Sequence, residues 1–203
     1  MTTGILAGPA RVLSREGVEV DMAVSALSRH VLLKALMPRL PQATRTFIMG
    51  MPGSNQWQEP VDLNSETTYA GSFGSTHAKT VVANEALVLH WAAANRLVYG
   101  LNPGLISTNI RGSVYGGRTW LASLMEHAIG LFSVTPDRYA HNVVPLFTAP
   151  ELADRPGLMF GQSGRAILPT PQLTDAARLS AWMRALDDLA ATAADAGSRA
   201  SAS

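Results

Sequence analysis

The chain has 203 residues, of which 47% are hydrophobic and 15% are charged. A chain of this size and composition can bury a substantial core, which excludes mostly disordered and fibrous proteins. Sixteen basic and 15 acidic residues give a net charge of +1, so the charge argues against a dedicated nucleic-acid binder. Cysteine is absent, which excludes disulfides, thiolate catalysis and cysteine-based metal sites.

Length and composition indicate one domain at 1–195, followed by a small, polar tail at 196–203 that we expect to be disordered. No apolar window approaches the roughly 20 residues that a membrane-spanning helix needs. The short apolar run near the start has no basic stretch before it, as an export signal would. The sequence therefore predicts a cytoplasmic protein without a membrane partner.

Helix-like and strand-like segments alternate through the first half of the chain. Apolar residues recur at helical spacing between Val20 and Met37. Thr46–Met51 has the length of a short strand, and a long polar loop follows at 52–74. Ser75–Asn95, rich in alanine, valine and leucine, is predicted to be a buried helix, and Leu97–Leu101 is predicted to be the next strand.

The second half continues the alternation. An apolar helix is expected at Trp120–Phe132, and Thr135-Pro136-Asp137 has the residues of a helix start. Short strands are expected at Leu158–Phe160 and Ala166–Leu168, and Thr174 is expected to cap a last helix that runs to about Ala194. Strands separated by helices imply a parallel sheet covered on both faces.

A series of short motifs occurs in a characteristic order. Ala7-Gly8 precedes the first helix, Ser75-Thr76-His77-Ala78-Lys79 opens the second long helix, and Asn102-Pro103-Gly104 closes the strand after it. From Gly4 to Leu168 this order and spacing resemble the C-terminal part of a short-chain dehydrogenase/reductase. The resemblance implies an α/β, truncated Rossmann-like doubly wound fold with a small, mostly parallel sheet.

The resemblance also implies a site built on a tyrosine and a lysine four residues later, on one helix face. Here Ser75 stands at the tyrosine position and Lys79 is retained, with His77 between them. Gly50 or Met51 replaces the serine of that family, and Ser25 replaces its asparagine. Because a serine hydroxyl is shorter and far less acidic than a phenol, hydride-transfer chemistry is expected to be lost.

The cofactor positions implied by the resemblance are incomplete. Thr3–Ala10 partly imitates a glycine-rich dinucleotide loop, but no strand precedes it and Pro9 lacks an amide donor. The first βαβαβ half is expected to be absent, so no cofactor is predicted. Vestigial cofactor-binding positions remain after the strand at Leu97–Leu101, namely Pro103, Gly104, Thr108 and Asn109.

Each candidate has a structural alternative. Lys79, Ser75 and His77 are the candidate catalytic residues, but Lys79 and His77 also fit a solvated helix end and Ser75 fits an N-cap. Pro103-Gly104 also fits a plain turn. The five histidines show no paired-ligand spacing, so no metal site is predicted.

Three functional hypotheses follow. The first is a degenerate short-chain dehydrogenase/reductase-like protein without independent NAD(P) redox activity, which acts as a partner subunit or as a cofactor-independent cyclase or isomerase on a small-molecule ligand. The second is an NAD(P)-dependent oxidoreductase that is a fragment or is completed by another chain. The third is a structural interaction protein without a site.

A homo-oligomer is also predicted, on two grounds. An open strand edge is expected near Gly4 to Gly8, where another chain could pair. The helix at Ser75–Asn95 is apolar on more than one face, and excess apolar surface marks an interface.

Overall fold

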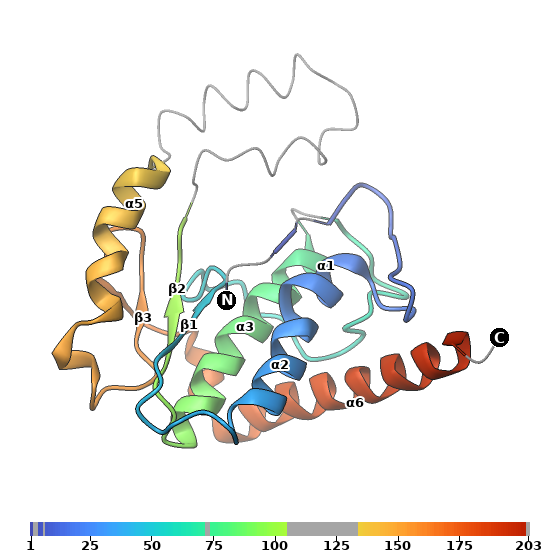
Figure 1. The fold of residues 1–203 in the computed structure, drawn as a ribbon. Helices are drawn as coiled ribbons and strands as arrows, with labels where there is room; N and C mark the ends of the chain where they lie inside the picture. The colour runs from blue at the N-terminus through green and yellow to red at the C-terminus, as the bar shows by residue number, and fades with distance from the viewer. Residues whose placement is uncertain (2–3, 6, 72–73, 105–133, 202–203) are drawn as a thin grey trace, which may run out of the picture.

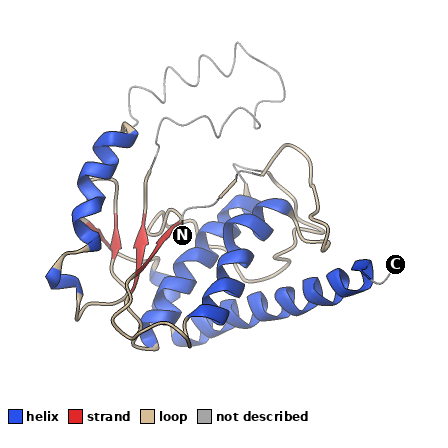
Figure 2. Ribbon diagram, in the orientation of Figure 1, coloured by secondary structure: helices blue, strands red, loops and turns tan. Residues whose placement is uncertain are grey.

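The computed structural model describes residues 1, 4–5, 7–71, 74–104 and 134–201. The predicted helix at Trp120–Phe132 and the candidate positions Thr108 and Asn109 lie outside the described residues. Within the described part, helices pack on a single small sheet (Figure 2).

The sheet has four strands in the order β1-β2-β3-β4. β1 (Thr46–Met49) pairs in parallel with β2 (Val98–Leu101), and β2 pairs in parallel with β3 (Met159–Phe160). β4 (Ala166–Ile167) returns antiparallel to β3. The predicted fold class is thus confirmed: an α/β, Rossmann-like arrangement with a small, mostly parallel sheet.

The first predicted helix is present but is not uniform. α1 (Val20–Met22) and α2 (Ser28–Leu36) are joined by the π-helical turn η1 (Ala23–Leu27). Glu19 is the N-cap residue of α1, because its side chain accepts a hydrogen bond from the backbone N–H of Met22 at 2.8 Å. α3 (Ser75–Ala93) follows the long loop and packs on β1, β2 and η1 (Figure 1).

The opposite face of the sheet is covered by α5 (Pro136–Val143), whose start was correctly predicted (Figure 1). The Thr135 hydroxyl accepts from the backbone N–H of Arg138 at 3.3 Å. Tyr139 and Val143 of α5 form a core cluster with Tyr99 and Leu101 of β2. Three short 3-10 turns complete this part of the chain, η3 (Val144–Phe147), η4 (Pro150–Leu152) and η5 (Pro171–Thr174).

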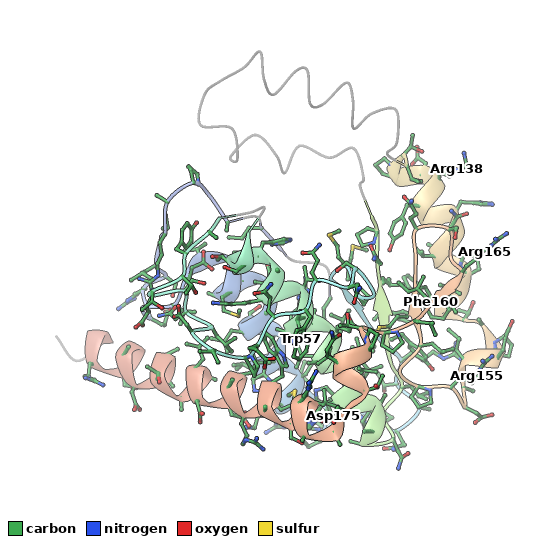
Figure 3. All side chains as sticks on the ribbon, turned by 180° about the vertical axis from the view of Figure 1, so that it is seen from behind. Trp57, Arg138, Arg155, Phe160, Arg165 and Asp175 are labelled. Carbon is green, nitrogen blue, oxygen red and sulfur yellow. The ribbon has the colours of Figure 1, made fainter. Side chains whose placement is uncertain are left out.

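The last helix, α6, spans Ala176–Ser201. The predicted cap at Thr174 is wrong, because its hydroxyl donates to the Pro171 carbonyl within η5. Asp175, which lies at the start of α6 (Figure 3), accepts from the backbone N–H of Arg178 instead. The helix continues beyond the predicted end at Ala194 and through most of the predicted tail at 196–203, since its alanine-rich sequence favours helix. None of the described helices is both long and apolar enough to cross a membrane.

The corrected cap gives a direct prediction. Asp175→Ala is expected to lower the free energy of unfolding by about 1 kcal/mol, because the N–H of Arg178 loses its acceptor and the dipole loses a charge. Asp175→Asn, which keeps the acceptor, should cost clearly less. Urea titrations followed by circular dichroism measure both; equal unfolding midpoints for wild type and the alanine variant would contradict the assignment.

Helix α6 also explains why α3 is apolar around most of its circumference. Val82, Leu87 and Val88 of α3 are buried in one cluster with Trp182 and Leu186 of α6. The second face of α3 is therefore covered within a single chain, and much of the apolar surface invoked for an oligomer is already buried. The homo-oligomer itself stays a prediction.

The described part of the segment near Gly4 to Gly8, which was expected to form an open strand edge, does not lie at an edge of the sheet. The described residues between Gly4 and Gly8 are not in a strand. Instead, the N–H of Ile5 donates to the Ser25 hydroxyl at 3.0 Å and that of Ala7 to the Asp21 carboxylate at 3.3 Å. The backbone of this segment is thus hydrogen-bonded to side chains of the helix that begins at Val20.

Candidate active site

The three candidate catalytic residues lie in the first turns of α3. Gly74, not Ser75, is the N-cap residue, and Ser75 is the first residue of the helix. Helical geometry places Ser75 and Lys79, four residues apart, on one face and His77 on another. Ser75 and Lys79 therefore face the loop before α3, whereas His77 faces α1.

Lys79 is buried, with 4% of its surface exposed. Its Nζ donates to the Asp62 carbonyl at 2.6 Å and to the Thr68 hydroxyl at 3.2 Å. Desolvation by burial lowers the pKa of Lys79, and the charge of Asp62 opposes that shift. The predicted alternative of a solvated lysine at the helix end is thus wrong, because the loop before α3 folds over the side chain.

Ser75 is held by the same loop. Its hydroxyl donates to the Thr68 carbonyl at 3.2 Å, so it does not cap the helix as the structural alternative expected. Thr68 therefore contacts both ends of the Ser75–Lys79 pair, through its carbonyl and its hydroxyl. These contacts close the loop over the helix face that the resemblance assigns to catalysis.

A carboxylate at the centre organises this loop. Asp62 accepts hydrogen bonds of 2.7 to 3.1 Å from three backbone N–H groups and two hydroxyls, those of Glu66, Thr67 and Thr68. Desolvation by burial raises the pKa of Asp62, but these hydrogen bonds outweigh it and bring the pKa well below its ordinary value. Asp62 thus fixes the same residues that hold Lys79.

The sign of this shift predicts a pH dependence. A carboxyl group whose pKa is lower in the folded state stabilises the fold above its unfolded value of about 4, and the contribution is lost as the pH falls through the folded value. The urea midpoints of wild type and Asp62→Asn should therefore differ fully above about pH 5 and converge progressively as the pH falls from about 4 toward the low folded pKa. Parallel curves over the whole range would contradict this role of Asp62.

His77 faces α1 rather than the loop. Its Nδ1 lies 2.7 Å from Oδ2 of Asp21, which is completely buried. Asp21 could not be predicted as the partner of His77 from spacing, because 56 residues separate the two. The predicted alternative of an exposed histidine is wrong, since only 18% of the His77 side chain is exposed.

A second polar group lies deeper between the helices. The buried Arg29 donates to the Met49 carbonyl and to Oδ1 of Asn84, both at 2.7 Å. Asn84 in turn donates to the carbonyl of Ser25 at 2.8 Å. Burial lowers the pKa of Arg29 to about 10, against the opposing charge of Asp21. These contacts join the end of β1 to both helices.

The position of the serine that the resemblance implies is closed by packing. A Cβ at Gly50 would lie 2.7 Å from the Cβ of Asn84, so a side chain cannot fit without displacement. Met51 follows with φ of 67°, in the left-handed region. The end of β1 therefore approaches α3 too closely to present a hydroxyl from Gly50.

The vestigial cofactor positions that the structure describes form a turn after β2. The N–H of Gly104 donates to the Asn102 side chain at 2.9 Å, and Asn102 donates to the Pro52 carbonyl at 2.8 Å. Gly104 has φ of 60°, and a Cβ there would lie 3.1 Å from Oε1 of Gln162. Pro103 lies within this turn. The turn therefore connects to the start of the long loop.

Metal ligation finds no support in the described part of the chain. No three histidine, aspartate or glutamate side chains there are gathered closely enough to hold a metal ion. The arrangement can instead hold and move protons, through the carboxylate, imidazole and hydroxyl groups around the start of α3.

Comparison with known proteins places this geometry in context. No family model matches the chain. Over 184 residues it is 40% identical to an uncharacterized oxidoreductase of Saccharomyces cerevisiae, an alignment that covers 85% of this chain and 59% of that protein. A crystal structure of an uncharacterized protein from Mycobacterium paratuberculosis is similar with a TM-score of 0.55 at 18% identity, over 92% of this chain and 64% of that one.

These similarities have different scope. The structural one concerns the fold alone and agrees with an α/β, Rossmann-like class. The sequence similarity is to a protein named an oxidoreductase, and the chain spans about three fifths of the length of that relative.

Proposed function

We propose that this chain is a degenerate short-chain dehydrogenase/reductase-like protein without independent NAD(P) redox activity. It acts as a cofactor-independent isomerase or cyclase on a small molecule, or as the binding subunit of an assembly. The 40% identity to a yeast protein named an oxidoreductase supports an oxidoreductase-type ancestry for the chain. It assigns no hydride transfer to this chain alone.

The observation that carries the proposal is the engagement of Ser75 and Lys79 with the loop before α3. Lys79 is bound to the Asp62 carbonyl and the Thr68 hydroxyl, and Ser75 to the Thr68 carbonyl. A lysine that holds a nucleotide ribose needs its ammonium group available, and a proton donor to a carbonyl needs its hydroxyl at the ligand. Here both groups bind the protein's own backbone and side chain.

Dinucleotide titration tests the proposal. Tryptophan fluorescence and calorimetry with NADH and NADPH are expected to give no saturable binding up to hundreds of micromolar. Thr68→Gly provides a second arm: it removes the hydroxyl that accepts from Lys79 and leaves the contact with the Asp62 carbonyl, and it is expected to bind no dinucleotide either. Micromolar binding by wild type, abolished in Lys79→Ala, would overturn the proposal.

The second candidate is an NAD(P)-dependent oxidoreductase whose dinucleotide-binding half comes from another segment or chain. The yeast relative, named an oxidoreductase and aligned over only 59% of its length, favours it. Co-expression with a Rossmann-type half should then create NADPH binding that neither part has alone. Unchanged behaviour of the mixture would favour the first candidate.

A further inference from the structure

The pair formed by Asp21 and His77 has the construction of a proton-transfer site. Nδ1 of His77 and Oδ2 of Asp21 are 2.7 Å apart, and they join α1 to the first turn of α3. Asp21 has no exposed surface, whereas His77 keeps 18% of its side chain exposed. A buried carboxylate thus binds an imidazole ring that keeps part of its surface exposed.

The surroundings determine which nitrogen is available. A carboxylate only accepts hydrogen bonds, so a neutral His77 donates its Nδ1 proton to Asp21 and keeps a lone pair on Nε2. Thr80, the nearest hydroxyl, donates to the His77 carbonyl at 2.8 Å and lies 3.5 Å from Nδ1. Asp21 therefore fixes the tautomer in which Nε2 is the base.

Hydrogen bonds satisfy only one of the two carboxylate oxygens of the buried Asp21 among the described residues. Its Oδ2 also accepts from the N–H of Ala7 at 3.3 Å, while Oδ1 has no hydrogen-bond partner among the described residues. A buried acceptor without a partner is energetically costly, and each such group calls for an explanation. The π-helical turn η1 begins two residues after Asp21, and such turns are frequent at functional sites.

The start of α3 supplies the matching positive charge. Gly74, its N-cap, provides no side-chain acceptor, and no described side chain caps the helix. The first N–H groups of a helix of this length carry a partial positive charge and bind anionic oxygens. His77 lies in this same turn, so a base and an anion-stabilising element stand side by side.

We propose that His77, oriented by Asp21, is a general base that removes a proton from the carbon beside the carbonyl group of a small ketone or aldehyde. The inference rests on the proposed function and gives its isomerase form a reaction class. Nε2 takes the proton, the C–H electron pair forms the C=C bond, and the carbonyl oxygen becomes an enolate oxygen facing the start of α3. The imidazolium then returns the proton to carbon, and no oxidant or reductant is consumed.

Solvent exchange measures this step without knowledge of the natural substrate. The protein in D2O, without any nucleotide, is mixed with acetone, hydroxyacetone or cyclohexanone, and proton NMR follows the loss of the α-hydrogen signals. Wild type is expected to accelerate exchange of at least one ketone above the rate in buffer. His77→Gln should reduce that acceleration roughly 10²-fold, the usual contribution of a general base.

Two further variants separate catalysis from folding. His90→Gln changes a histidine at the other end of α3 and should leave exchange unchanged. Asp21→Asn keeps the imidazole but removes the negative charge beside Nδ1 and allows an amide N–H2 group to donate to it, so exchange should fall at least roughly tenfold. In 15N-edited spectra, the proton of His77 should move from Nδ1 in wild type to Nε2 in Asp21→Asn.

Several results would overturn the inference. They are the absence of enzyme-dependent exchange with all three ketones, an equal rate in His77→Gln, or an Nε2–H tautomer in wild type. A purely structural pair would lower the urea midpoint in His77→Gln without any exchange activity to lose. Because no nucleotide is present, this outcome is separate from the dinucleotide titration that tests the proposed function.

Discussion

Glu85→Ala is expected to lower the free energy of unfolding by about 3–5 kcal/mol, because it leaves several buried donors without an acceptor. Glu85 lies on α3 with 1% of its surface exposed. Its carboxylate accepts from the N–H of Gly53 at 3.0 Å, from the Thr170 hydroxyl at 2.9 Å and from the Thr170 N–H. One side chain thus holds the start of the long loop and the segment before η5.

The backbone at these contacts cannot easily find another arrangement. Gly53 has φ of 70°, and a Cβ there would lie 2.7 Å from the Leu168 carbonyl oxygen. The loop and the β4 end are therefore packed against each other, and water has little room to replace the carboxylate. This is why the expected loss is several times that of the helix cap at Asp175.

Matched variants measure the contribution of each contact. Glu85→Gln keeps one acceptor oxygen and should lose less than the alanine variant, while Thr170→Val removes only a hydroxyl and should cost about 1 kcal/mol. The double variant should show coupling, because both changes affect one hydrogen bond. Urea midpoints provide the comparison, and a loss below about 1 kcal/mol in Glu85→Ala would contradict the role of Glu85.

The regular elements could be predicted from sequence because they depend on local rules. The apolar spacing of Val20 to Met37, the proline and threonine at the start of α5 and the short apolar strands are visible within a few residues. The errors at Thr174 and at the end of α6 are also local. Two adjacent residues, Thr174 and Asp175, both could cap, and the hydroxyl is used inside η5.

The site was only partly predictable, because its contacts join distant segments. Sequence placed Ser75, His77 and Lys79 on one helix start, but nothing in their spacing indicates that a loop carbonyl binds Lys79. Asp21 lies 56 residues before His77. A buried acid inside an apolar helix was the one available signal, since such residues are almost never buried without a partner.

The same limit applies to one of the two grounds for the predicted oligomer, which itself stays a prediction. A helix that is apolar around most of its circumference, as α3 is, needs a partner on more than one side. The partner for much of that surface is α6, more than 80 residues later in the same chain. From sequence, an intramolecular and an intermolecular partner give the same pattern.

Trp182→Ala is therefore expected to be the most disruptive change in α6, with a loss of about 3–5 kcal/mol. Trp182 has no exposed surface and belongs to the main core cluster with Val82 and Leu87 of α3. Its Nε1 has no hydrogen-bond partner among the described residues, so the loss comes from packing and the cavity. The variant should also bare the second face of α3.

Trp182→Phe is the matched control, because it keeps an aromatic ring and removes an unpaired N–H group, so it should cost clearly less. Arg178→Ala, which removes only the contact 5.6 Å above the Trp57 ring, should cost at most about 1 kcal/mol.

Urea unfolding measures stability, and sedimentation at micromolar concentration measures association. If α6 is what covers α3, the alanine variant should associate more strongly than wild type does. Unchanged stability and mass would show that the two helices do not depend on this contact.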